Sequence, residues 1–305
     1  MTLRILTRTS RRAGTSAAVA ALSLALLAAC GDASAAEPAA SPTPKGQERQ
    51  YRIQAITADC MKQRGFKYIP YVPPPRQETE EERKRDSGDY AAMKAFREKY
   101  GYGVWASIVY PAQFGNPSVK PEGNPPVDPN WEIQGSLSAA QNRAYREALD
   151  ACFAQGVKQV TGKEVSSVFD QGNRVNARID QLKTRELDGD PRLVKLAADM
   201  AACLKAKGYR IGSTTPSALG DRGAKTFRAE MSRIGREQRK LPESVSGDSV
   251  IVVPDMPADA ARPYLTREIK DALDDLECGK DFYPVYTPKS REIDRRAYVE
   301  YGIQG

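Results

Sequence analysis

The chain contains no histidine among its 305 residues. This absence excludes the Ser-His-Asp and Cys-His pairs that activate a nucleophile, and it excludes zinc sites built on imidazole. Lysine and carboxylate bases remain available, so an enzyme is not excluded on this ground alone. The sequence also has no Cys-x-x-Cys spacing, no glycine-rich phosphate loop and no EF-hand spacing. It therefore predicts neither a metal nor a cofactor.

Long hydrophobic runs are missing as well. Hydrophobic residues make up 40% of the chain and charged residues 28%, which is typical of a polar globular protein rather than a membrane bundle. The length allows either one large domain or two smaller ones, with enough residues to bury a substantial core.

The formal net charge of +7 does not arise from a basic block. The chain has 46 basic and 39 acidic residues, and four of the basic ones lie in residues 1–29, which contain no acid. Elsewhere the two signs are interleaved, so the sequence predicts no nucleic-acid partner.

Residues 1–29 have the layout of a secretory signal peptide. The arginines precede an apolar run, Ala17–Leu27, which is too short to cross a bilayer because a span needs about 20 residues. The run ends in Leu27-Ala28-Ala29-Cys30, which resembles the bacterial lipobox. That resemblance implies cleavage after Ala29 and attachment of a lipid to the Cys30 sulfur. An ordinary secreted protein with a chance cysteine at this point is the alternative.

Residues 30–50 follow as a segment rich in alanine, serine and proline, with little to bury. We expect this segment to be a disordered tether between the lipidated Cys30 and a folded body. The expected location is the outer face of the cell membrane, with the lipid as the membrane contact. Ser10-Arg11-Arg12 matches only part of a twin-arginine signal, so the export route stays open.

The remaining four cysteines become disulfide candidates once export is expected. The phrase Cys60–Lys67 is repeated as Cys203–Arg210, each with a Cys, basic residues, a Gly and an aromatic residue, as at the end of a helix. Cys152 and Cys278 lie late in two other helical stretches. We hypothesise two related modules, 51–160 and 161–305, closed by Cys60–Cys152 and Cys203–Cys278. Four cysteines allow three pairings, and the sequence leaves all three open.

These phrases also carry a family resemblance. Together with Tyr100–Gly103, Leu137–Leu149 and the run Asp190-Pro191-Arg192-Leu193, they resemble a group of exported actinobacterial lipoproteins over residues 51–285. The chain departs from that group at Ala140, where an acid is usual, and in the apolar insertion Val250–Val253. The resemblance implies the architecture and the location, and it implies no activity.

Helical periodicity dominates residues 51–305, so the predicted class is mainly α. The best-marked helices begin at Ser138, which forms a capping box with Gln141, and at Asp190, which precedes Pro191. Further helices are expected around the apolar positions of 51–64, 79–100, 175–182, 227–234 and 265–276, the last being the final long helix. Short strands are expected only at 104–110 and 249–253, and 111–135 is expected to be a long proline-rich loop.

Two clusters are candidate sites. Tyr100, Tyr102 and Trp105 would stack on a cell-wall sugar if they were exposed, whereas burial, which we favour, makes them a core turn. Asp274, Asp275 and Glu277 would supply a carboxylate pair, but neighbouring acids on a helix point to different faces, and a solvated surface is favoured. Gly247–Val250 resembles the start of a GDSL esterase block, but the chain has no histidine to activate the serine of such an esterase.

The sequence therefore favours a lipid-anchored, non-catalytic binding or scaffold protein of the cell envelope. Its expected partner is an envelope protein or a cell-wall glycan. The alternative is a carboxylate-dependent hydrolase of the cell-wall glycan, which would need two acids about 5–10 Å apart in a cleft. A solute-binding lipoprotein is disfavoured because strands and helices do not alternate along the chain.

Overall fold

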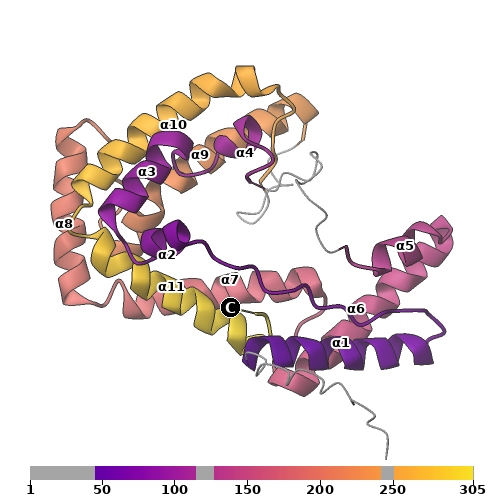
Figure 1. Cartoon of the computed structure of the whole chain (residues 1–305). Helices are drawn as coiled ribbons and strands as arrows, with labels where there is room; N and C mark the ends of the chain where they lie inside the picture. The colour runs from indigo at the N-terminus through magenta and orange to yellow at the C-terminus, as the bar shows by residue number, and fades with distance from the viewer. Residues whose placement is uncertain (1–44, 115–126, 242–250, 305) are drawn as a thin grey trace, which may run out of the picture. The chain divides into compact units, whose positions relative to one another are not determined.

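The computed structural model describes residues 45–114, 127–241 and 251–304, and this part of the chain contains helices and no strand (Figure 1). The predicted mainly α class is confirmed. The helices are α1 (Lys45–Gln63), α2 (Glu80–Asp86), α3 (Tyr90–Tyr100), α4 (Ala106–Val109), α5 (Asn130–Gly135), α6 (Ala139–Thr161), α7 (Val168–Glu186), α8 (Pro191–Ala206), α9 (Pro216–Arg239), α10 (Ala258–Cys278) and α11 (Tyr283–Glu300).

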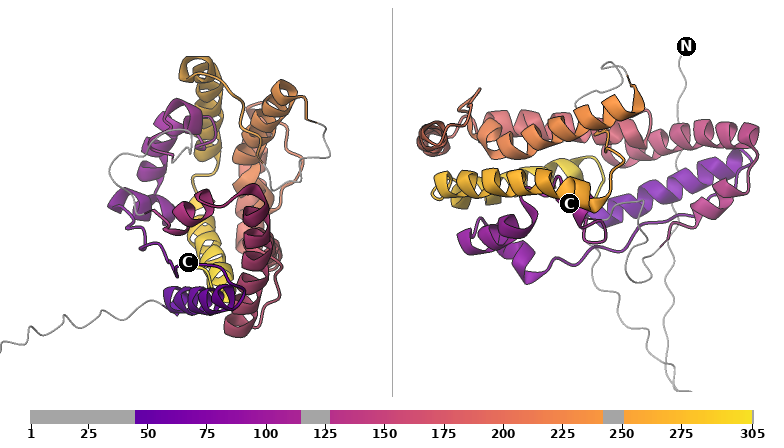
Figure 2. Two further views of the ribbon diagram at one scale, coloured as in Figure 1. Left: turned by 90° about the vertical axis from the view of Figure 1, so that its right-hand side faces the viewer. Right: turned by 90° about the horizontal axis from the view of Figure 1, so that it is seen from above.

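The first disulfide joins α1 to α6, which lie against each other (Figure 2). Cys60 and Cys152 are bonded with their Cα atoms 5.5 Å apart, and both are buried in a small apolar cluster with Met61 and Tyr145. Close packing continues to Gly156, where a Cβ atom would lie only 2.9 Å from the Ile53 carbonyl oxygen. The capping box of Ser138 predicted for α6 is present.

The second disulfide joins α8 to α10. Cys203 and Cys278 are bonded, again with a Cα separation of 5.5 Å, so both hypothesised pairings are confirmed. Asp190 caps α8 by accepting hydrogen bonds from Arg192 N and Leu193 N, as predicted. The main core lies beside this disulfide. It gathers apolar residues of α7, α8, α10 and α11, including Val175, Leu193, Met200, Leu276 and Ile293.

Helix α10 is the central element of the packing, because α3, α4, α8 and α9 all contact it. Contacts therefore cross the expected module boundary at residue 160. The described residues, from Lys45 onwards, form one compact unit. The division into 51–160 and 161–305 stays a prediction from the cysteine pattern.

The strand expected at 104–110 is wrong, since Ala106–Val109 forms α4. The apolar residues of this segment are buried, and its first amide groups are bound by a side chain of α10 rather than by a neighbouring strand. For the strand expected at 249–253, residues 249 and 250 lie outside the described residues, and 251–253 form no strand. Val252 instead donates its N–H to Ser232 Oγ at 3.2 Å.

Three boundaries also differ from expectation. Residues 45–50 of the expected tether are helical, because Gln47 is buried and Arg49 Nη1 donates to the Val299 carbonyl oxygen at 2.8 Å. The expected loop 111–135 contains α5 at its end. Helix α11 follows the helix expected to be the final long one; it tolerates a proline in its first turn and Pro288 inside it.

No helix in the described ranges is both long enough and apolar enough to cross a membrane.

Candidate polar network and groove

Several predicted site residues lie outside the described part of the chain. These are the proposed lipidation site Cys30 and the whole of Gly247–Val250. The other predicted residues all fall within helices or loops that the structure describes. The aromatic and acidic ones lie on α10 or pack beside it, whereas Cys60 and Cys152 join α1 to α6.

The aromatic cluster packs against α10 as a core turn. Trp105 is fully buried and stacks on Tyr264, with ring centroids 4.3 Å apart. Tyr100 is half-buried and makes edge-on contacts with Tyr110 and Phe114. Trp105 therefore offers no free face for a sugar ring, in agreement with the packing interpretation of this cluster.

The turn after α3 wraps around the side chain of Glu268, which requires glycine at position 101. Its Oε1 accepts hydrogen bonds from Tyr102 N and Val104 N at 2.7 and 2.9 Å, and its Oε2 accepts one from Trp105 N at 2.8 Å. Gly101 has φ +59°, and a Cβ atom there would lie 2.7 Å from Glu268 Cγ, so only glycine fits. Burial raises the pKa of Glu268 to about 7, although the backbone donors act to lower it.

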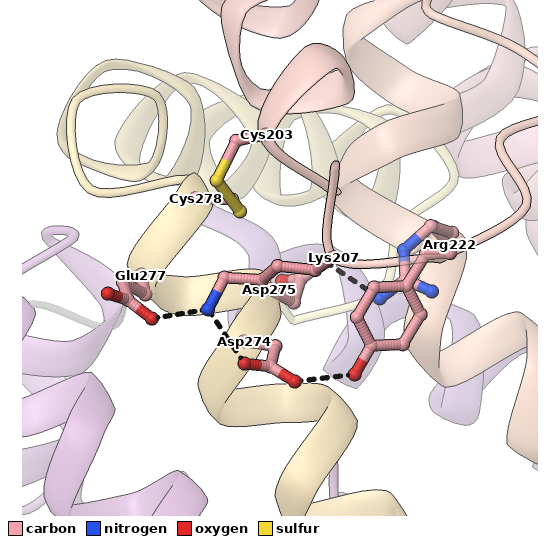
Figure 3. The surroundings of a disulfide bond; sticks show 8 residues. Cys203, Lys207, Arg222, Asp274, Asp275, Glu277 and Cys278 are labelled. Carbon is pink, nitrogen blue, oxygen red and sulfur yellow. Dashed lines mark hydrogen bonds and ion pairs between the residues drawn. A yellow bond between two sulfur atoms is a disulfide. The ribbon is translucent and has the colours of Figure 1, made fainter. Parts of the chain in front are cut away.

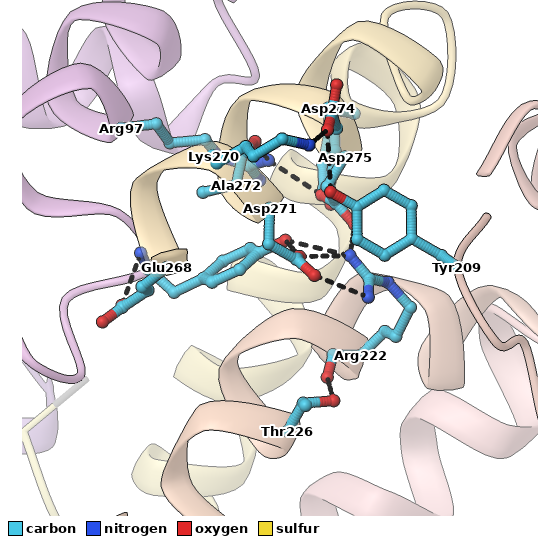
Figure 4. A network of polar contacts seen from close by, with 12 residues as sticks. Arg97, Tyr209, Arg222, Thr226, Glu268, Lys270, Asp271, Ala272, Asp274 and Asp275 are labelled. Atoms are coloured by element: carbon cyan, nitrogen blue, oxygen red, sulfur yellow. Dashed lines mark hydrogen bonds and ion pairs between the residues drawn. The ribbon is translucent and has the colours of Figure 1, made fainter. Parts of the chain in front are cut away.

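A second group of charges lies one to two turns further along the same face of α10. We call Arg97, Arg222, Asp271, Asp275, Tyr102 and Tyr283 the α10 polar network. Figure 4 shows its two arginines and two aspartates. Asp275 is fully buried and accepts hydrogen bonds from Arg97 Nη1 at 2.8 Å and from Tyr283 Oη. Arg97 also donates to the Ala272 carbonyl oxygen at 2.7 Å. The network thus ties α3 and α11 to α10.

Arg222 brings α9 into the network. Its Nη2 pairs with Asp271 and lies 3.2 Å from Asp275 Oδ2, while Tyr102 Oη donates to Asp271 Oδ1 at 2.6 Å. Two arginines and two aspartates balance each other here, so neither carboxylate is left as an unpaired buried charge.

The acids at the end of α10 divide between surface and interior. Lys207 Nζ lies 2.9 Å from Asp274 Oδ1 and 2.7 Å from Glu277 Oε2, next to the Cys203–Cys278 disulfide (Figure 3). Partial burial alone would raise the pKa of Asp274, but hydrogen bonds from Lys207, Lys270 and Tyr209 lower it. A solvated position was expected for Asp275 too. That expectation is wrong because Arg97 and Arg222 make burial of this carboxylate tolerable.

Next to the network, a groove of about 1000 Å³ lies between α7, α9 and α11. We call it the α7–α9–α11 groove. Tyr283 connects it to the network, since this residue lines the groove and also binds Asp275. Tyr286 packs against α9 at Gly220, where a Cβ atom would lie 2.3 Å from the tyrosine Cζ.

The charges lining the groove are unevenly paired. Lys183 Nζ lies 3.6 Å from Asp294 Oδ1, and Arg291 Nη2 lies 2.9 Å from Asp86 Oδ1. By contrast, the side chains of three cations on α9 have no hydrogen-bond or ion-pair partner among the described residues, although they line the same groove. They are Lys225, Arg228 and Arg236.

Sequence reasoning missed both the network and the groove. The spacing of Glu268, Asp271 and Asp275 on one helical face was visible in the sequence and indicated a shared direction. Their partners Arg97 and Arg222 are far away in the sequence, however. The three cations of α9 likewise share a face, but they line a groove only because α7 and α11 pack beside that helix.

Within the described ranges, no group of three or more cysteine or acidic side chains is placed to hold a metal ion. Comparisons with protein-family models, with curated proteins and with solved structures find no match to this chain.

Proposed function

We propose that the chain is a lipid-anchored protein of the outer face of the cell membrane that acts by binding an envelope component, without catalysing a reaction. The observation that carries the binding role is the α7–α9–α11 groove, where three cations line an open surface and have no partner among the described residues. Charges on a folded protein that are not used internally are available to a ligand.

The buried carboxylates support a role without catalysis. Asp271 and Asp275 are held by arginines, and Glu268 by backbone amides, so these acids hold helices and a turn in place. A carboxylate-dependent hydrolase instead needs one acid free to donate a proton and a second free to attack or to activate water.

The proposed location rests on different features. The lipobox at Cys30 implies the anchor, and two disulfides suit a protein that folds in an oxidising compartment. The resemblance to exported actinobacterial lipoproteins agrees with both. Labelled fatty acid should be incorporated by the producing cell into the wild-type chain and not into Cys30→Ala; equal labelling of the two would contradict the anchor.

The binding role is tested by incubating the whole chain, with its disulfides formed, with the producer's purified wall and with its solubilised membrane. We expect saturable capture of one component by the wild type, reduced capture by the double variant Arg228→Gln/Arg236→Gln, and wild-type capture by Arg143→Gln. Arg143 is an exposed cation of α6 outside the groove, so it controls for the loss of charge. Absence of capture would overturn the proposal, and release of soluble sugar from the wall would favour the hydrolase.

A further inference from the structure

The α9 wall of the groove presents its cations as a row. Lys225, Arg228 and Arg236 all line the groove, and Ser232 lies between the last two. One acid, Asp221, precedes the row on the same helix, so the cations outnumber the acids on this wall. With a rise of 1.5 Å per residue, the row spaces its charges by about 4.5 Å and about 12 Å along the helix axis. Such a row matches a chain with repeated negative charges better than it matches a single anion.

The facing wall has a different chemistry. Helices α7 and α11 contribute the paired charges Lys183, Asp294 and Arg291 to the lining. They also contribute amide, hydroxyl, carboxylate and aromatic groups, which are Asn176, Asp180, Thr287, Ser290 and Tyr298. Asp180 is exposed, and its side chain has no partner among the residues that the structure describes. A free carboxylate in a binding groove accepts hydrogen bonds from ligand hydroxyl groups and repels ligand carboxylates.

The two walls together select among anionic chains. An acidic peptide would satisfy Lys225, Arg228 and Arg236 but would place its carboxylates near Asp180 and Asp294. A chain that alternates phosphates with hydroxyl-bearing units would place its phosphates on the α9 wall and its hydroxyls on the α7–α11 wall. Arginine is well suited to the first contact, because its planar fork binds two phosphate oxygens at once.

We propose that the α7–α9–α11 groove binds a polyol- or sugar-phosphate polymer of the cell wall, with phosphates on Lys225, Arg228 and Arg236 and hydroxyls on Asp180. This inference rests on the proposed binding function and names its ligand class. The concave groove, about 1000 Å³ in volume, suits a single polymer chain better than the flat surface of a membrane.

The test is calorimetric titration of the whole oxidised chain with four probes. They are a glycerol-phosphate oligomer of about six units, a polyglycerol of the same length without phosphate, a hexaglutamate peptide, and vesicles that contain phosphatidylglycerol. We expect the glycerol-phosphate oligomer to bind most tightly and its affinity to fall with added salt. Tighter binding of hexaglutamate or of polyglycerol, or binding to the vesicles alone, would overturn the proposal.

Three variants locate the contact. Arg228→Gln/Arg236→Gln should weaken binding of the glycerol-phosphate oligomer at least tenfold, whereas Arg143→Gln should change it less than twofold. Asp180→Asn tests whether Asp180 accepts hydrogen bonds from ligand hydroxyls or only adds negative charge to the groove. It should weaken binding of the glycerol-phosphate oligomer, because the anionic acceptor for its hydroxyls is lost. It should strengthen binding of hexaglutamate, because the repulsion between Asp180 and the peptide carboxylates is removed. Tighter binding of both probes to Asp180→Asn would overturn the assigned role of the α7–α11 wall.

The outcome also separates this inference from the function on which it rests. Capture of a wall or membrane component without any affinity for the glycerol-phosphate oligomer would leave the binding function standing and would refute the ligand class. Failure of capture together with failure of titration would refute both.

Discussion

At the residue scale, the fold changes the protonation of Glu268. It is fully buried, and three backbone N–H groups of the turn after α3 point at its carboxylate. Desolvation nevertheless outweighs these donors and raises its pKa to about 7, from an ordinary 4.5. The folded chain therefore holds this proton more tightly than the unfolded chain does.

The pH dependence of stability follows from that difference. Glu268 favours folding fully below pH 4.5, and this contribution, on the order of 3 kcal/mol, is lost as the pH rises to about 7. The variant Glu268→Gln carries no such proton. Urea unfolding from pH 4 to pH 8 should therefore show the stability of the variant rising relative to wild type with pH. A constant difference between the two proteins across this range would contradict the expectation.

Two glycines in helices provide a matched pair at the same scale. A Cβ atom at Gly223 of α9 would lie 1.9 Å from Tyr102 Cζ, whereas one at Gly172 of α7 would meet nothing within 4 Å. Gly172→Ala should stabilise the protein by about 0.5–1 kcal/mol through helix propensity. Gly223→Ala should destabilise it by about 1–3 kcal/mol, because Tyr102 must move. Chemical denaturation of both variants checks this, and two shifts of equal sign would refute the close contact.

At the element scale, α10 has a buried acidic face. Glu268, Asp271 and Asp275 recur at the spacing of one helical stripe, and each is bound by a group from a different part of the chain. Capping residues and periodicity were sufficient to predict α6 and α8 from the sequence. They could not predict this stripe, because local patterns describe acids as solvated, and the pairing of Arg97 with Asp275 spans 178 positions.

Removing one member of the stripe should therefore be costly. Asp275→Ala leaves the guanidinium of Arg97 buried beside no carboxylate of its own, and we expect a loss of about 3–5 kcal/mol in unfolding free energy. Asp259→Ala is the control on the same helix, since its pair with Arg262 is exposed and should be worth less than about 1 kcal/mol. Equal losses in the two variants, measured by denaturant unfolding, would show that the α10 polar network does not stabilise the fold.

At the scale of the whole molecule, packing and cysteine pattern suggest different divisions. The repeated cysteine phrase indicated two modules, and both of its disulfides form. Contacts of α3 and α4 with α10 join the halves, and the sequence could not indicate these contacts because no local pattern encodes them. The candidate groove depends on the same long-range assembly, since its walls come from three separate helices.

This assembly predicts how the protein unfolds. Because contacts cross residue 160, we expect one thermal transition rather than two. Cys60→Ala/Cys152→Ala and Cys203→Ala/Cys278→Ala should each lower the midpoint of that single transition, at a cost of about 2–5 kcal/mol. Scanning calorimetry distinguishes the cases. A scan in which each pair of substitutions shifts only one of two separate transitions would instead support independent modules.

The disulfide between α1 and α6 also determines how the protein would respond to mechanical load. Tension applied at the N-terminal side enters through α1 and passes at Cys60 directly to Cys152, a shortcut across 92 positions of the chain. The covalent path bypasses the intervening residues while that bond is intact, and about 300 Å of extended chain cannot be drawn out by the pulling force. A protein pulled from its N-terminal side would therefore extend first without the residues between Cys60 and Cys152. Those residues would add to its length only after the disulfide is reduced.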